Sequence, residues 1–292
     1  MILYNKNKWL EVYKNEKYEN IRNTILSTFE DLVFVDEGHK YFINGKELLS
    51  VSVVTHKFVK PFDSETKAIE TSKRNWNRPS SKYYRMTPEE ILAQWKEKNL
   101  KATTHGTAIH EFGESCFYYM IGEYDKILPN FKDRLTEDGG FESREPKEDA
   151  VVRFYQDIPK CIVPILAETK VYEQSLGYAG TFDILFYYDA ELDGKPSYRS
   201  GLLIMDYKTN EDLYKNFNTQ KMLPPFDSLY DMAFSTYKLQ LSLYQICIEN
   251  TGLKVLGRRI LWLKPNGQYD KLNLEEYTNL LIETLSQEKF LF

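Results

Sequence analysis

Two aspartates and a lysine near the middle of the chain are the residues best suited to chemistry. Asp183 ends the motif Gly-Thr-Phe-Asp, and Asp206 follows an apolar run. Lys208 comes two residues after Asp206, and side chains alternate across a strand, so these two project from the same face. If the two segments are paired strands, two carboxylates and an ammonium lie together. Such a group can bind a hard divalent cation and stabilise charge on a phosphate.

The same residues also have a purely structural interpretation, a strand-end salt bridge followed by a solvated turn. The run Leu202–Met205 is continuously apolar, which is typical of a central strand buried on both faces. An Asp and a Lys directly after such a strand are costly to bury unless they pair or coordinate a metal. A tripeptide as loose as Asp-x-Lys therefore needs support from other parts of the chain.

Two helical motifs add possible site residues. His110 and Glu114 are four residues apart, as are Gln240 and Tyr244, so each pair lies on one helical face. The first pair can supply a metal ligand and a residue that orients it. The second pair can hydrogen-bond a phosphate or a base. Taken alone, each pair is better explained structurally, the first as a capped core histidine and the second as a Gln-Tyr contact on a helix surface.

Taken in order, these motifs resemble one family. The chain runs through Gly-Thr-x-x-His-x-x-x-Glu, Glu-x-x-x-Tyr at Glu168, Gly-x-x-Asp, Asp-Tyr-Lys-Thr and Gln-x-x-x-Tyr. Between Thr104 and Leu263 this order resembles the PD-(D/E)xK nuclease superfamily, in its RecB-like and phage-type exonuclease branch. The resemblance implies an α/β fold with a restriction-endonuclease-like α-β-β-β-α-β core, in which helices flank a central mixed sheet. It also implies metal-dependent hydrolysis of DNA.

The resemblance assigns roles to the residues of the central motifs. His110, Asp183, Asp206 and the backbone carbonyl of Tyr207 would hold the metal. Lys208 would be the catalytic lysine, which orients the attacking water or stabilises charge on the scissile phosphate. Oxygen ligands with one imidazole suit Mg²⁺ or Mn²⁺, and one or two ions are equally compatible with them.

Four further residues receive roles on the same basis. Glu168 matches an acidic, catalytic position just before the first core strand of the family. Gln240 and Tyr244 match the helix that flanks the substrate, and Glu114 is a supporting residue.

The three cysteines set this chain apart from several RecB-like relatives, in which four cysteines hold an iron–sulfur cluster. Cys116, Cys161 and Cys247 are scattered among apolar neighbours and cannot supply four thiolates. We therefore expect no iron–sulfur cluster. Free, scattered cysteines also suit a reducing cytoplasm.

Composition excludes other classes of protein. The 292 residues, 42% hydrophobic and 28% charged, are enough for one large domain or two modest ones. A net charge of −5 argues against a general nucleic-acid coat protein, although a nuclease needs only a local basic patch. No signal peptide or membrane span is recognisable, so we expect no membrane partner and a cytoplasmic location, that of the bacterial host if the protein is phage-encoded.

One segment is basic in an otherwise acidic chain. From Lys57 to Arg85, eight basic residues face three acidic ones, with Trp76, Tyr83 and Tyr84 between them. Cations interleaved with aromatic rings suit a channel for single-stranded nucleic acid. A solvated helix and loop explains the segment equally well. The residues proposed here to bind substrate are Lys73, Arg74 and Arg78.

The domain organisation follows from the position of the motifs. Residues 1–100 are predicted to form an accessory lobe, with an amphipathic helix at 2–29, a β-hairpin turning at Asn44-Gly45 and the basic segment. Residues 101–292 are predicted to form the nuclease core, which ends in a helix over 272–292. A second turn at Asp193-Gly194 predicts an extended hairpin between Asp183 and Asp206.

The favoured function is a metal-dependent exodeoxyribonuclease that acts in replication, recombination or repair. A phage origin is suggested by the stand-alone architecture, since no helicase motif such as a Walker A loop is present. Its substrate partner would be DNA, either single-stranded or at duplex ends. Further expected partners are a second copy of the chain, in a homo-oligomer, or phage replication and recombination proteins. The alternatives are a structure-specific endonuclease and a non-catalytic DNA-binding protein that retains the fold. An unrelated hydrolase with His110 and Glu114 as metal ligands is a third. Polarity of digestion and preference for DNA or RNA stay open.

Overall fold

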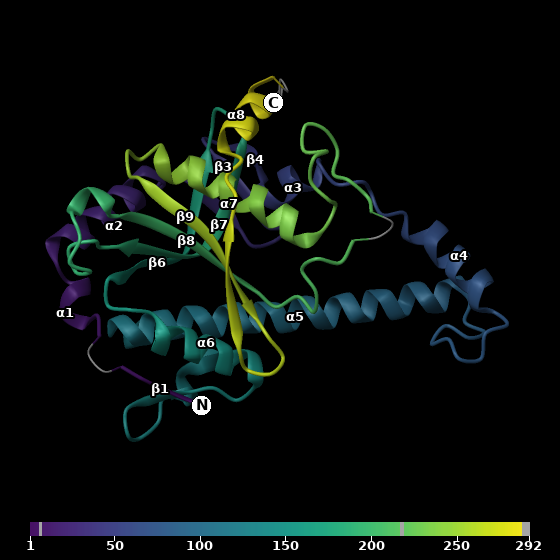
Figure 1. The fold of residues 1–292 in the computed structure, drawn as a ribbon, viewed down its shortest axis with the longest axis horizontal. Helices are drawn as coiled ribbons and strands as arrows, with labels where there is room; N and C mark the ends of the chain where they lie inside the picture. Colours follow the sequence, from purple (N-terminus) through teal and green to yellow (C-terminus); the bar gives the residue numbers. More distant parts are fainter. Residues whose placement is uncertain (6–7, 217–218, 288–292) are drawn as a thin grey trace. The chain divides into compact units, whose positions relative to one another are not determined.

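The computed structural model describes residues 1–5, 8–216 and 219–287 (Figure 1). Contacts divide the chain into two compact units. The larger one combines residues 1–59 with residues 110–292, and the smaller one covers residues 60–109. The predicted boundary at residue 100 does not coincide with the limits of these units, and it stays a prediction.

A mixed sheet forms the centre of the larger unit. Its strands follow the order β10-β9-β8-β7-β4-β3-β2, and β6 pairs with β7. Neighbours β7 and β8 are antiparallel, whereas β8 and β9 are parallel. A separate small sheet joins β1 (Ile2–Tyr4) to β5 (Gly140–Glu142). The bounds of the central strands are β2 (Val33–Val35), β3 (Lys40–Ile43), β4 (Lys46–Ser50), β6 (Ile162–Glu173), β7 (Tyr178–Tyr188), β8 (Gly201–Lys208), β9 (Val255–Leu263) and β10 (Tyr269–Leu274).

Helices cover both faces of this sheet. Helix α7 packs against β6 and β9, and α6 packs against β9 and β10 (Figure 1). Strand β8 separates the two layers, because Tyr207 contacts Tyr155 of α6 and the next residue, Lys208, contacts Tyr237 of α7. The helices are α1 (Leu10–Tyr13), α2 (Glu16–Thr28), α3 (Val51–His56), α4 (Ser64–Asn75), α5 (Pro88–Ile121), α6 (Pro146–Asp157), α7 (Ala233–Glu249) and α8 (Thr278–Gln287).

The predicted α/β architecture is confirmed. The elements that carry the motifs follow one another as α5, β6, β7, β8, α7 and β9, with β5 and α6 inserted after the first helix. Strand β8 is buried along nearly its whole length, as expected for a central strand. In the part of the chain described above, no helix is both long and apolar enough to cross a membrane.

The N-terminal segment differs from its prediction. Residues 2–29 do not form one helix, since Ile2–Tyr4 pair with β5 and Asn15 begins a new helix by accepting a hydrogen bond from the Lys17 N–H at 2.9 Å. The hairpin is confirmed: β3 and β4 turn through Asn44 and Gly45, both at positive φ. Strand β4 then adds to the central sheet beside β7.

The C-terminal helix is shorter than its prediction. Residues 272–274 belong to β10, because they pair with β9, and the helix itself is α8. The predicted residues 288–292 lie outside the described part of the chain. Between β7 and β8 the predicted antiparallel hairpin is confirmed, and Gly194 at its tip has a φ of +68°.

The smaller unit contains α4 and the beginning of α5. A capping box starts α5, in which the Thr87 N–H donates to Glu90 Oε2 at 2.8 Å and the Glu90 N–H donates to Thr87 Oγ1 at 3.3 Å. The Trp95 Nε1–H of this helix donates a hydrogen bond to the Tyr83 hydroxyl at 2.9 Å. The three proposed substrate-binding residues, Lys73, Arg74 and Arg78, have exposed side chains at the end of α4 and just beyond it.

Candidate active site

The site forms where β7 and β8 part. Their ladder ends with Ile184 opposite Met205. At the next position the Asp183 carboxylate accepts a hydrogen bond from the Tyr207 N–H at 2.7 Å, in place of a backbone carbonyl. This bond fixes the Asp183 side chain at the junction, where Asp206 follows Met205 on the neighbouring strand. The structure therefore brings both aspartates to the end of the paired region.

Glu168 reaches the same place from β6. Ala167 pairs with Ile184 and Thr169 with Phe182, so Glu168 falls opposite Asp183. Its φ of +43° is left-handed, a conformation that costs a residue with a Cβ about 1–2 kcal/mol. Backbone strain of this kind persists only where the surroundings enforce it, and it gathers at functional sites.

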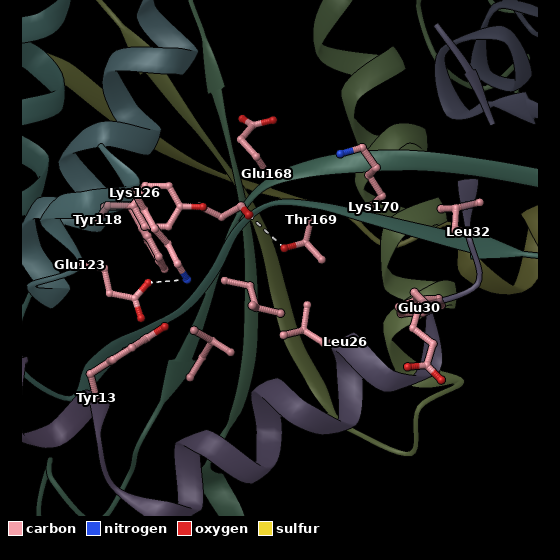
Figure 2. A pocket seen from close by; sticks show the side chains of 15 residues that line it. Tyr13, Leu26, Glu30, Leu32, Tyr118, Glu123, Lys126, Glu168, Thr169 and Lys170 are labelled. Atoms are coloured by element: carbon pink, nitrogen blue, oxygen red, sulfur yellow. Dashed lines mark hydrogen bonds and ion pairs between the residues drawn. The ribbon is translucent and has the colours of Figure 1, made fainter. Parts of the chain in front are cut away.

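A cavity of about 380 Å³ lies against the same part of β6. Glu168 lines it, but the Glu168 carboxylate points away from Tyr13 and Leu26 on the opposite wall (Figure 2). The ion pair between Glu123 and Lys126, at 2.7 Å, belongs to another wall. The acidic end of Glu168 is thus turned toward the cluster of ligands rather than into the cavity.

Three side chains from different elements form that cluster. One ligand atom each from His110 of α5, Glu168 of β6 and Asp183 of β7 lie within 4.8 Å of one another. His110 Nδ1 is 3.1 Å from Asp183 Oδ2. An imidazole and two carboxylates match the ligands that Mn²⁺ and Mg²⁺ take in proteins. The cluster therefore fits a divalent cation.

The electrostatics of the cluster favour such a cation. Burial and the Asp183 carboxylate raise the pKa of Glu168 to about 9, so without a cation this carboxyl keeps its proton at neutral pH. Burial lowers the pKa of His110, but Asp183 outweighs burial and raises it to about 9. The pKa of Asp183 is lowered, because His110 outweighs burial. His110 and Asp183 thus neutralise each other, whereas Glu168 keeps a proton that a bound cation would displace.

Asp206 and Lys208 form a second pair beside the cluster. They make an ion pair, with only 3% and 12% of their side chains exposed. Burial and Asp183 raise the pKa of Asp206 to about 6. Burial lowers the pKa of Lys208, but the Asp206 carboxylate and Tyr237 raise it by more, so the ammonium stays charged. Asp206 is not one of the three clustered ligands.

An aromatic residue holds the helix of His110 against the sheet. The Tyr207 ring lies 5.8 Å from the His110 ring, edge to face. Its hydroxyl is 3.2 Å from that of Tyr155, which in turn donates to the Gly113 carbonyl at 3.4 Å. A methyl group on Gly113 would overlap the Tyr207 ring. Sequence reasoning used only the Tyr207 carbonyl, whose role as a ligand stays a prediction, and it missed Tyr155 and Gly113.

The Gly-x-x-Asp and Gln-x-x-x-Tyr motifs meet at Gly180. A Cβ on Gly180 would lie 2.8 Å from Tyr244 Cε1, so the glycine leaves room for the Tyr244 ring. Tyr244 is 4% exposed and hydrogen-bonds Gln240 one turn earlier. Both residues therefore lie on the α7 side of the site, and their contact with substrate stays a prediction.

Glu114 lies one turn after His110 on α5. Burial raises its pKa, and its own charge helps to raise the pKa of Glu168. Its contribution to the site is therefore electrostatic.

The Lys208 side of the site includes residues that sequence reasoning missed. Lys208 Nζ lies 4.2 Å from the centre of the Tyr237 ring, and the Tyr237 hydroxyl donates to Asn210 Oδ1 at 2.8 Å. Trp262 is opposite Lys208 in the β8–β9 ladder, and its Nε1–H donates to the Asn210 carbonyl at 2.8 Å. The sequence does place Asn210 two residues after Lys208, but the partners of Asn210, Tyr237 and Trp262, are distant in the chain.

Comparisons with known proteins contribute little here. No family model matches the sequence, and no curated protein matches it. A crystal structure of a candidate exonuclease from Eubacterium rectale is similar over 82% of this chain and 78% of its own, at 14% identity and a TM-score of 0.40. A likeness this slight carries no conclusion about function. The function proposed below depends on the site itself.

Proposed function

We propose that this protein is a metal-dependent nuclease that hydrolyses phosphodiester bonds of DNA. One observation carries the proposal: three ligands from α5, β6 and β7 gather beside a buried, charged lysine. A divalent cation and a lysine are the two charges that stabilise a phosphate as its ester bond breaks. The order of the motifs along the chain supports the same function.

The proposed ligands of the cation are His110, Glu168 and Asp183. Asp206 and the carbonyl of Tyr207 complete the set by the family resemblance. Mg²⁺ and Mn²⁺, as one ion or two, are the proposed metals. When bound, such a cation supplies Lewis acidity toward the phosphate and an activated water.

The protein's own residues prepare the site for this chemistry. His110 and Lys208 neutralise Asp183 and Asp206, so the carboxylates are kept in place while they carry charge. The Lys208 ammonium, held between Asp206 and the Tyr237 ring, is proposed to stabilise charge on the scissile phosphate or to orient the water. Gln240 and Tyr244 on α7, and Lys73, Arg74 and Arg78 in the smaller unit, are proposed to bind the DNA.

The more specific part of the proposal is exonuclease action in phage replication, recombination or repair. It rests on the family resemblance. Cleavage of covalently closed circular DNA would instead indicate an endonuclease.

The first test uses end-labelled linear DNA and covalently closed circular DNA, each single- and double-stranded, with Mg²⁺, Mn²⁺ or EDTA. Wild type is compared with Lys208→Ala and with Lys195→Ala, a control at an exposed lysine on the β7–β8 hairpin. We expect metal-dependent loss of linear DNA with wild type and Lys195→Ala, and none with Lys208→Ala. DNA binding by wild type without cleavage under any metal would favour the non-catalytic alternative.

A further inference from the structure

An unbroken series of contacts leads away from Lys208 along the α7 face of the sheet. It passes from the lysine to the Tyr237 ring, from the Tyr237 hydroxyl to Asn210, and from Asn210 to Trp262. The Trp262 ring then contacts Tyr214, with 6.1 Å between ring centres and 77° between ring planes. The aromatic residues beside the candidate active site are therefore continuous with the lysine that would contact a phosphate.

Tyr214 at the end of this series is exposed and yet held in place. Its side chain is 46% exposed, although its ring packs on Phe234 at 5.0 Å. The Tyr214 N–H donates to Asp212 Oδ1 at 2.8 Å, and the Phe234 N–H donates to the carbonyl of the neighbouring Leu213 at 3.0 Å. A large ring that is fixed before binding offers contact area at a small entropic cost.

Cations lie along the same series. Lys264 lies over the Trp262 ring and pairs with Asp270 at 2.9 Å, and Lys208 lies over the Tyr237 ring. Partly exposed rings next to ammonium groups, with the exposed Tyr214 ring beside them, suit a chain of phosphates with accessible bases, since bases stack on rings while phosphates contact cations. A duplex keeps its bases stacked inside and cannot offer one to Tyr214 without unpairing.

We propose that Tyr214, supported by Phe234 and Trp262, is a base-stacking site for single-stranded nucleic acid that enters the site at Lys208. The inference rests on the proposed nuclease function, because it names the form of substrate that the same site receives. Bases of the strand stack on the Tyr214 ring, and the adjoining phosphates lie toward Lys264 and Lys208.

Binding is tested in EDTA, so that no cleavage interferes. The anisotropy of a fluorescein-labelled single-stranded deoxyoligonucleotide, and of a blunt duplex of the same length, is measured against wild type, Tyr214→Ala and Tyr214→Phe. Tyr198→Ala is the matched control, since Tyr198 is 72% exposed on the β7–β8 hairpin. We expect Tyr214→Ala to weaken single-strand binding about tenfold or more, with Tyr214→Phe and Tyr198→Ala close to wild type and duplex binding unchanged. Circular dichroism checks that each variant is folded.

The inference is overturned if wild type does not bind the single strand, if Tyr214→Ala binds it as wild type does, or if duplex binding falls equally. These outcomes are separate from failure of the nuclease function. Tyr214-dependent binding by a protein that cleaves nothing would leave the stacking site and remove the function. Cleavage by a protein whose Tyr214→Ala variant binds normally would remove only the stacking site.

Discussion

Asp183 in β7 and Asp189, just past its end, are both buried, but their surroundings differ. Asp189 accepts hydrogen bonds from the Lys17 ammonium at 2.7 Å, from the Tyr18 hydroxyl at 2.6 Å and from the Glu191 N–H at 3.0 Å. Its pKa is lowered, since these donors outweigh burial. The charge of Asp189 is therefore compensated by the protein's own donors.

The pKa of Asp183 is lowered as well, but the carboxyl groups around it differ from those around Asp189. Three carboxylates share the site with one histidine and one lysine, and the pKa values of Glu168 and Asp206 are raised by burial and by Asp183. The left-handed φ of Glu168 adds strain. The charge of the structural aspartate is thus compensated by the protein's own donors, whereas the candidate site raises carboxyl pKa values and keeps a proton on Glu168 that a cation would replace. This difference is a physical reason for treating one acidic cluster as functional and the other as structural.

The strongest test of the comparison exchanges each aspartate for asparagine. We expect Asp183→Asn to reduce metal-dependent cleavage by about 10³-fold or more, because it removes a ligand and the partner of His110. Single-turnover cleavage measures the loss, and calorimetry measures metal binding. Asp189→Asn should cleave at the wild-type rate. Equal losses of cleavage in the two variants would contradict the distinction between a functional Asp183 and a structural Asp189.

A second test asks whether the ligands need α5 to lie close to β8. In Gly113→Ala the new methyl group collides with the Tyr207 ring and moves His110 away from Asp183. We expect Mn²⁺ affinity to fall about 10- to 100-fold, as for loss of a group that orients a ligand. The control is Gly257→Ala, whose Cβ would be 3.7 Å from its nearest neighbour, Leu203. Unchanged affinity in Gly113→Ala would show that the helix tolerates the shift.

A third test concerns Asp189, just past the end of β7. Asp189→Asn should lower the free energy of unfolding by about 1–3 kcal/mol, measured by urea denaturation, because Lys17 and Tyr18 lose a charged acceptor. The lowered pKa of Asp189 means that its contribution is present above pH 4 and is lost as the pH falls below that value. The variant and wild type should therefore converge in acid, and a difference that persists there would point to packing instead.

The smallest expected effect is a gain, rather than a loss, in the free energy of unfolding. Because the pKa of Glu168 is about 9 in the folded protein and about 4.3 when unfolded, the folded state binds the extra proton and loses stability as the pH rises between these values. In EDTA, Glu168→Gln should therefore be more stable than wild type at pH 8 and about equal to it at pH 4. A wild type that is more stable at pH 8 would show that Glu168 is compensated after all.

Several features followed from local rules and could be predicted. Asp206 and Lys208 share a face because strand side chains alternate, and their ion pair is observed. The Asn44-Gly45 turn and the start of α5 at Thr87 depend on residues next to each other. The helix predicted over 2–29 was wrong where Ile2–Tyr4 pair with β5, a partner more than a hundred residues away.

The acidic and basic residues of the site, and the alternation of side chains along its strands, can be read directly from the sequence. That Glu168 joins His110 and Asp183 cannot be read there, because its position depends on the register of β6 against β7 and on a left-handed backbone. Only the tertiary structure decided this, and it also decided that Tyr207 supports α5 and that Trp262 and Tyr214 adjoin Lys208. Such contacts join elements far apart in the chain, where periodicity and propensity carry no information.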